Sequence, residues 1–195
     1  AKAFPDLEPK KKPVKKRTQK RKTTTHKKKR SKNKTWACYN ISMYQEFVQF
    51  LNAKKRLCII QAENPDGDSL GSAIALDYIL SQTENSLYCP VDIPKYLRYF
   101  PDWSRVTNEL DYKADGYIIV DTASSILLSK LLDDTAIKNC LYNKPVFVID
   151  HHETADDLDF PHEAIIEPRP ACADLIFQIA KSSNYDIPPE AACAL

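Results

Sequence analysis

The chain has 195 residues, of which 43% are hydrophobic and 28% charged, a composition typical of one compact domain with an additional segment rather than of two domains. It contains no run of 18 apolar residues and no signal-peptide pattern at its start, so we predict no membrane span or secretion and a cytoplasmic location. The six cysteines form no CxxC pair and several lie in apolar runs, so we expect buried thiols rather than disulfides or a zinc site.

The positive charge of the chain is concentrated at its start. Residues 1–34 contain 16 of the 28 Lys and Arg residues but only 2 of the 26 Asp and Glu residues, so their net charge is +14 and that of residues 35–195 is −12. Because residues 10–34 have hardly an apolar side chain, we predict a disordered basic tail over 1–36 and one folded domain over 37–195. Such a tail favours nonspecific binding to RNA or ribosomes; the alternative is a solvated tail or a trimmed targeting segment.

The first elements predicted after the tail are a helix and a strand. Met43, Phe47, Phe50 and Leu51 have the i, i+4, i+7, i+8 spacing of an amphipathic helix that covers a sheet. The Ile-rich run over 56–61 is typical of a buried parallel strand.

A turn and a second helix follow. The sequence NPDGD at 64–68 ends the strand, and a helical pattern resumes over 70–80. Residues 86–93 form a weaker strand candidate. The next segment, 94–103, is bounded by proline and rich in aromatic residues, and its pattern leaves its form open.

Strands and helices continue to alternate in the second half of the chain. The apolar runs over 116–120 and 145–149 predict two more strands, and the leucines of 127–132 share one helical face between them. Residues 171–181 predict a further helix, and a last one begins at Pro188. This alternation indicates βαβ units, and we therefore expect an α/β fold with a Rossmann-like parallel sheet flanked by helices.

Acidic residues follow three of the four predicted strands. Because the carboxyl ends of parallel strands line the ligand crevice of an open α/β sheet, these acids and a neighbouring histidine pair should meet there. One acid after a strand is usually a helix N-cap or a turn residue, but three such ends with two histidines favour a site. The residues are Asp66, Asp68, Asp121, Asp150, His151 and His152.

These residue types favour a metal centre. Clustered carboxylates repel one another unless a cation lies between them, and carboxylate oxygens with imidazole suit manganese or a mixed set of divalent ions. Gly67 is free to adopt the positive φ of a tight turn, which would direct Asp66 and Asp68 to one site. The helix that starts near Leu70 would direct free backbone N–H groups toward a phosphate.

Other chemistries find less support. We expect at least one of His151 and His152 to bind metal or phosphate, whereas His162 has nothing to raise it above a surface or packing role. The sequence contains no GxSxG, GxGxxG or GxxxxGK[ST] motif, which excludes a nucleophile elbow and the common nucleotide-cofactor loops.

Three segments resemble the first three motifs of the DHH phosphoesterases: NPDGDSLGS at 64–72, VDTAS at 120–124 and IDHHET at 149–154. PRPACADLIFQI at 168–179 is similar to the segment that follows in the branch of nanoRNases and 3′-phosphoadenosine 5′-phosphate phosphatases. The resemblance covers about residues 40–195. It implies a parallel-sheet domain that hydrolyses phosphodiesters, phosphomonoesters or pyrophosphate with two divalent ions, commonly manganese, by in-line attack of an activated water on phosphorus.

The resemblance also implies a role for each motif residue. One ion would be held by Asp66, the second by Asp68 and His151, and both by Asp121. Catalytic roles would fall to Asp121, to Asp150 as a support and to His152 near the substrate phosphate. Substrate contacts would come from Gly71, Ser72 and His152.

Two departures from the family pattern affect these expectations. The family usually has a His where this chain has Ala62, so the first ion would be weakly held, held with help from Glu63 or Asn64, or lost. The chain begins at Ala1 rather than Met and stops at Leu195, before a further family Asp ligand and a substrate-binding C-terminal domain, so we expect a fragment.

We therefore expect a manganese-dependent phosphoesterase that acts on short oligoribonucleotides or nucleotide bisphosphates. The alternatives are a DHH-fold nucleic-acid-binding or regulatory module without turnover, or another DHH chemistry: cyclic dinucleotide hydrolysis, single-strand exonuclease or pyrophosphatase activity. Tyr96, Tyr99, Phe100 and Trp103 either stack on bases or, as we favour, pack across the sheet edge. The sequence leaves the substrate and the oligomeric state open.

Overall fold

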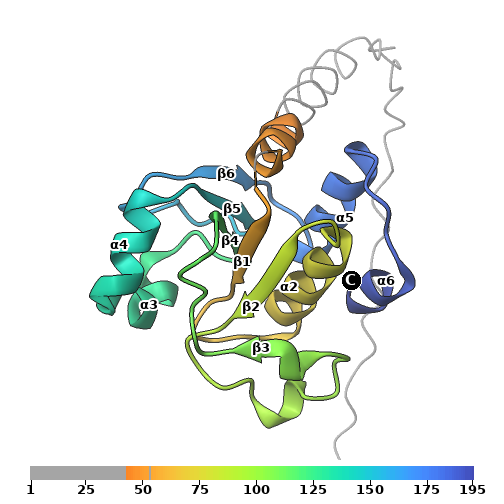
Figure 1. The fold of residues 1–195 in the computed structure, drawn as a ribbon. Coiled ribbons are helices and arrows are strands. Elements are labelled where there is room, and N and C mark those ends of the chain that lie inside the picture. Colours follow the sequence, from red (N-terminus) through yellow and green to blue (C-terminus); the bar gives the residue numbers. More distant parts are fainter. Residues whose placement is uncertain (1–42, 53) are drawn as a thin grey trace, which may run out of the picture.

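The computed structural model describes residues 43–52 and 54–195, so the basic tail predicted over 1–36 lies outside the described residues. The described part is built on one sheet of six parallel strands, as the sequence predicted. In spatial order the strands are β3 (Val106–Thr107), β2 (Glu84–Tyr88), β1 (Arg56–Ile60), β4 (Gly116–Val120), β5 (Val146–Asp150) and β6 (Glu163–Ile166) (Figure 1). The strand order reverses between β1 and β4, and the carboxyl ends of such a pair are where open α/β sheets bind ligands.

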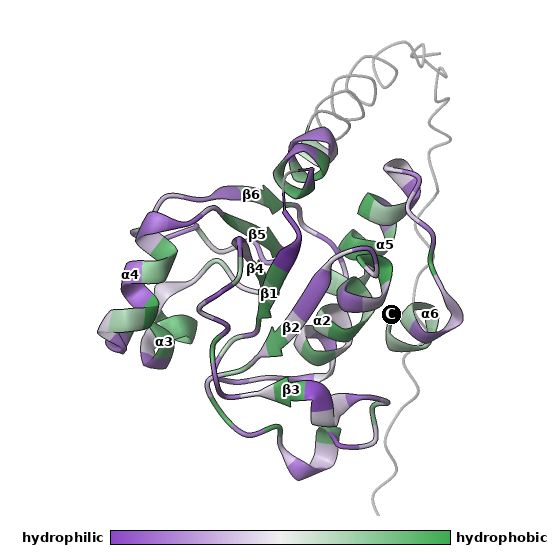
Figure 2. Cartoon of the chain, in the orientation of Figure 1, coloured by the Kyte–Doolittle hydropathy of each residue, from purple (hydrophilic) through white to green (hydrophobic). Residues whose placement is uncertain are grey.

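Helices cover both faces of this sheet. On one face lie the helix over 43–51, α2 (Gly67–Ile79), α5 (Cys172–Ser182) and α6 (Pro189–Ala194); on the other lie α3 (Ser129–Asp133) and α4 (Thr135–Asn143). Alternate residues of each strand supply the two cores, so the central strands are buried on both sides and are strongly hydrophobic (Figure 2). None of the helices within the described residues has the length and apolar character needed to cross a bilayer.

The buried elements are close to those predicted. β4 matches the predicted 116–120, and the helix predicted over 171–181 is shifted by one residue. α2 begins at Gly67, three residues before the predicted 70, because Asp66 caps it there.

Three small elements were not predicted. α4 buries only Ile137 and Leu141, β6 contains one fully buried residue, Ile165, and β3 has two residues, so none carries a long apolar pattern. The aromatic segment 94–103, whose form the sequence left open, contributes two short 3₁₀ turns, η1 (Lys95–Leu97) and η2 (Trp103–Arg105). A third such turn, η3 (Ser125–Leu128), precedes α3.

The cysteines of the described residues are free thiols, as predicted. Cys58, Cys89 and Cys172 are buried, and Cys140 is partly buried. Cys193 is exposed, so the prediction of burial is wrong there. The reason is its position on α6, which directs Ala191 and Ala194 to the core instead.

Candidate metal centre

The loop after β1 ends in a capped helix start. Oδ1 of Asp66 accepts hydrogen bonds from the backbone N–H groups of Asp68 and Ser69, both at 2.9 Å. In return the Asp66 N–H donates to the Ser69 hydroxyl at 3.0 Å, which completes a capping box. Two of the amides expected to face a phosphate are therefore occupied by the protein's own carboxylate. Gly67 lies in the first turn of α2 and has no positive φ, so the prediction that it adopts the positive φ of a tight turn is wrong.

The Asp68 carboxylate faces the start of a second helix, α5. Its Oδ2 accepts from the Cys172 N–H at 2.7 Å, and its Oδ1 accepts from the Ala173 N–H at 3.0 Å. The Ser72 hydroxyl lies 3.4 Å from the same Oδ1. The two amides at the start of α5 thereby fix the direction of both carboxylate oxygens.

Asp121 occupies a strained and buried position at the end of β4. Its φ is +66°, a left-handed conformation that costs on the order of 1 kcal/mol, and its residue is only 7% exposed. Oδ1 has no hydrogen-bond partner. Burial, with the negative charges of Asp68, Asp66 and Asp150, raises the pKa of Asp121 from 3.8 to about 8. A buried carboxylate oxygen without a hydrogen-bond donor is what a cation site provides.

Asp150 organises the turn that follows β5. Its buried Oδ1 accepts from the backbone N–H groups of His151 at 2.8 Å and His152 at 3.3 Å. The same oxygen lies 2.7 Å from Nδ1 of His152, which must donate to it, while Oδ2 has no hydrogen-bond partner. This contact leaves Nε2 of the exposed His152 free to meet a ligand.

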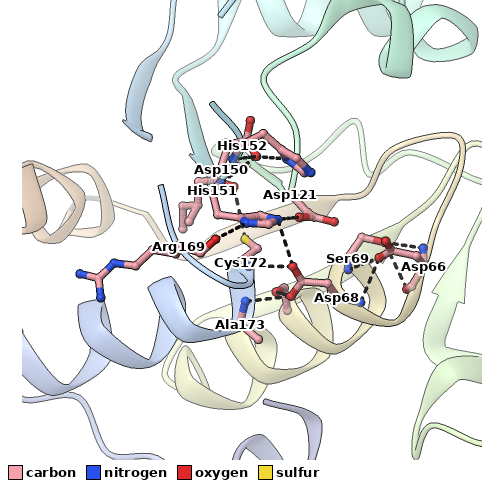
Figure 3. A network of polar contacts seen from close by, with 12 residues as sticks. Asp66, Asp68, Ser69, Asp121, Asp150, His151, His152, Arg169, Cys172 and Ala173 are labelled. Carbon is pink, nitrogen blue, oxygen red and sulfur yellow. Dashed lines mark hydrogen bonds and ion pairs between the residues drawn. The ribbon is translucent and has the colours of Figure 1, made fainter. Parts of the chain in front are cut away.

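His151 points into the site between two acids. Its Nδ1 lies 2.9 Å from the carbonyl oxygen of Arg169, which can only accept, so Nδ1 carries a proton. Nε2 lies 3.3 Å from Oδ2 of Asp68 and 3.3 Å from Oδ1 of Asp121 (Figure 3). In the neutral ring three lone pairs therefore converge, and either a proton on Nε2 or a cation between the groups relieves their repulsion.

The side chains present fit a divalent ion. Asp121, His151 and His152 offer ligand atoms that all lie within 4.8 Å of one another, and Asp68 adjoins His151. Carboxylate oxygen with imidazole nitrogen is a donor set that manganese accepts. Of the predicted metal ligands, the structure brings Asp68, Asp121 and His151 into contact, while Asp66 caps α2 and acts on Asp121 through its charge.

Of the two residues expected to replace the missing family histidine, Glu63 has its carboxylate turned elsewhere. Ala62 is buried. The Glu63 carboxylate turns to the start of α3, where it accepts from the Ser129 hydroxyl at 3.0 Å and the Lys130 N–H at 2.8 Å. Help from Glu63 is therefore wrong for this structure, because a helix start already holds its charge. Asn64 is exposed.

Gly71 and Ser72 both lie in the buried part of α2. A Cβ on Gly71 would lie 2.4 Å from the carbonyl oxygen of Ala194, so glycine is required where α6 crosses α2. Ser72 is fully buried and its hydroxyl faces Asp68. The structure gives both residues packing or positioning roles, and their contact with a substrate stays a prediction.

The sequence singled out 168–179 by resemblance but predicted no role for Arg169 or for the amides at the start of α5. The Arg169 guanidinium bridges Glu167, at 3.1 Å, and Asp174, at 3.3 Å, while its carbonyl holds His151. The α5 amides that hold Asp68 follow within four residues. These last contacts use backbone atoms, which carry no signal in residue type.

We expect Arg169→Gln to weaken Mn²⁺ binding by about tenfold, because residues that orient metal ligands typically contribute 10- to 100-fold in affinity. Arg56→Gln is a matched control, since Arg56 also bridges two acids, Glu84 and Asp111, but at the amino end of β1. Titration followed by electron paramagnetic resonance measures both. Equal Mn²⁺ affinities in the two variants would contradict the positioning role.

The chain matches one protein family and two curated relatives. The DHH family, N-terminal domain, matches residues 56–195. The chain is 27% identical over 157 residues to the bifunctional oligoribonuclease and PAP phosphatase NrnA of Mycoplasma pneumoniae. It is 30% identical over 156 residues to the protein of the same name from Mycoplasma genitalium.

Both alignments cover 77% of this chain and 47% of the relative, so the chain spans about half the length of the curated relatives it matches. Among solved structures, an exopolyphosphatase-related protein from Bacteroides fragilis superposes with a TM-score of 0.67 at 20% identity. That superposition covers 78% of this chain and 48% of the other, and it shows a shared fold.

Proposed function

Because the chain belongs to the DHH family, whose enzymes are metal-dependent, we propose that it hydrolyses phosphoester bonds of short oligoribonucleotides or nucleotide bisphosphates with manganese. One observation carries the proposal: Asp68, Asp121 and His151, from three distant segments, meet at the point where the strand order reverses. The substrate class is supported by the two relatives, which are named as oligoribonuclease and PAP phosphatase.

The chain's own residues would prepare this reaction. Asp68, Asp121 and His151 would hold a divalent ion, which supplies positive charge that polarises water and phosphoryl oxygens. The carbonyl of Arg169 keeps Nε2 of His151 available, and α5 holds Asp68. Asp150 holds the ring of His152 through Nδ1, so that its Nε2 would face a substrate phosphate.

A hydrolysis assay with the full-length protein tests this proposal. RNA dinucleotides and 3′-phosphoadenosine 5′-phosphate are incubated with Mn²⁺ or with EDTA, and products are separated by chromatography. We expect product only with metal, and His152→Gln should lower the rate on the order of a hundredfold. His162→Gln is the control, since His162 pairs with Asp156 outside the site and should leave the rate within about twofold. No product above the EDTA level would overturn the proposal.

The second candidate is a binding or regulatory module that has lost turnover. Ala62 and the capping role of Glu63 favour it, because they leave only Asn64, of the two expected replacements, for one metal position. Calorimetric titration with Mn²⁺ separates the two: the enzyme should bind two ions, and the degenerate module one or none. The other DHH chemistries are tested with their own substrates in the hydrolysis assay.

The basic tail supplies a separate proposal. We assign residues 1–36 to nonspecific binding of RNA or ribosomes and residues 37–195 to the DHH domain, in a cytoplasmic protein. RNA affinity that falls steeply with salt, and is lost when 1–36 are deleted, would support this assignment. Equal affinity after the deletion would contradict it.

A further inference from the structure

The aromatic segment 94–103 divides into a packed and an exposed part. Phe100 and Trp103 pack against the core, as favoured from the sequence. Tyr96 and Tyr99 are 69% and 75% exposed, the latter as fully as any large hydrophobic residue in the described chain. The expected packing across the sheet edge therefore holds for two of the four rings only.

The exposed part is connected through Phe100 to the start of α2, where Asp66 and Asp68 lie. The segment follows β2, whose carboxyl end lies at the same sheet edge as Asp121. The Phe100 ring is 3.8 Å from where a Cβ on Gly67 would lie, and Gly67 separates Asp66 from Asp68. The ring centroid of Tyr99 is 4.8 Å from that of Phe100, with planes inclined by 32°. One ring thus separates Tyr99 from the start of α2.

Several contacts fix this segment. Leu97 is buried in η1, and Nε of Arg98 donates to the Ile93 carbonyl at 3.0 Å. The Arg98 guanidinium stacks on Trp103 at 4.6 Å, and the Tyr78 hydroxyl donates to Asp102 at 2.5 Å. Because the backbone around Tyr99 is held in this way, less of the segment has to be ordered when a ligand binds, which favours binding.

The charge around Tyr99 differs from that of the rest of the domain. Residues 35–195 carry a net charge of −12, yet Lys95 and Arg98, which flank Tyr96 and precede Tyr99 in sequence, are both exposed. Aromatic faces bind any nucleobase by stacking, and interleaved cations attract the phosphates that connect the bases. This composition fits a nucleotide better than an uncharged or basic partner.

We propose that Tyr99 is a stacking platform for one nucleobase of the substrate, with Lys95 and Arg98 attracting its backbone, while a phosphate of the same molecule lies at the metal centre. The inference rests on the proposed function and extends it to a base-binding subsite. Because stacking recognises any base, the subsite should accept short single strands with little sequence preference. It would favour substrates that carry a base over simple phosphate esters.

Steady-state kinetics on an RNA dinucleotide test the platform. We expect Tyr99→Ala to raise KM by about tenfold and to change kcat less than twofold, since stacking is lost and the reacting groups are untouched. Tyr99→Trp should restore the KM. Tyr112→Ala is the matched control: Tyr112 is 49% exposed but lies near the amino ends of the strands, where Lys144 contacts its carbonyl. If the KM of Tyr99→Ala equals the KM of Tyr112→Ala, the stacking platform is overturned.

An equilibrium measurement separates this inference from the proposed function. The probe is a dinucleotide whose bridging ester oxygen is replaced by methylene, so that it keeps its charge and is not cleaved. We expect Tyr99→Ala to bind this probe about tenfold more weakly than wild type does. An analogue of the probe that lacks one base should bind to wild type about as weakly as the complete probe binds to Tyr99→Ala. If wild type hydrolyses no substrate but Tyr99→Ala still binds the probe more weakly, only the proposed function is overturned. If Tyr99→Ala binds the probe as tightly as wild type does, the stacking platform is overturned.

Discussion

Asp121→Asn should reduce hydrolysis on the order of a thousandfold and make the metal-free protein more stable at alkaline pH. Activity is lost because the neutral amide cannot replace the charge of a carboxylate that adjoins His151. Asparagine is the informative substitution, since it tolerates the φ of +66° and keeps the shape of the side chain. The backbone at the end of β4 should therefore be unchanged.

The stability effect follows from the raised pKa of Asp121. In the unfolded chain this pKa is 3.8, and in the folded protein burial and the neighbouring acids raise it to about 8. Below about pH 4 the Asp121 carboxyl is protonated in both the folded and the unfolded state, so it gives stability no dependence on pH there. Between the two values only the folded state retains the proton, so stability falls as pH rises, by at most about 1.4 kcal/mol per pH unit, and the loss is complete above about pH 8.

Thermal unfolding of the metal-free proteins between pH 5 and pH 9 measures this effect. Wild type should lose stability across the window more steeply than Asp121→Asn. Mn²⁺ at pH 8 should raise the Tm of wild type and leave that of the variant nearly unchanged, because only a bound ion stabilises the folded state. Equal pH slopes in the two proteins would contradict the account of Asp121.

Asp68→Asn should lower Mn²⁺ affinity at least about a hundredfold and the free energy of unfolding by about 1 kcal/mol. The two effects have different origins. The lost charge removes a metal ligand beside His151, and the amide caps the start of α5 less well than the carboxylate that now accepts from Cys172 and Ala173.

Glu63→Gln is a control that separates metal ligation from helix capping. The Glu63 carboxylate, like that of Asp68, accepts a hydrogen bond from a backbone N–H at a helix start, but that helix is α3. We expect a similar loss of stability, measured by urea unfolding, and an Mn²⁺ affinity within about twofold of wild type, measured by calorimetry. If both variants lost metal affinity equally, the effect of Asp68 would be one of folding and not of ligation.

The sequence was most informative where burial is complete. β4 and β5 are buried over their whole length, so their apolar runs predicted strands and placed Asp121 and Asp150 at strand ends. Parallel pairing then implied that these acids share an edge. The existence of a site was thus predictable from the period and ends of the strands, without knowledge of side-chain contacts.

Other parts of the site could not be predicted, because they depend on tertiary contacts. Asp68 meets Cys172, 104 residues later, through a backbone amide, and His151 is oriented by the carbonyl of Arg169. Glu63 has the chemistry of a metal ligand, yet its direction is set by the start of α3. Gly67 is helical, since the cap at Asp66 starts α2 earlier than the apolar pattern indicated.

An anomalous difference map from a crystal of the protein soaked in Mn²⁺ tests the central claim most directly. The account predicts a manganese peak in bonding contact with an oxygen of Asp68, an oxygen of Asp121 and Nε2 of His151. A map with no peak among these three side chains, or crystal coordinates that place them on separate surfaces, would contradict it.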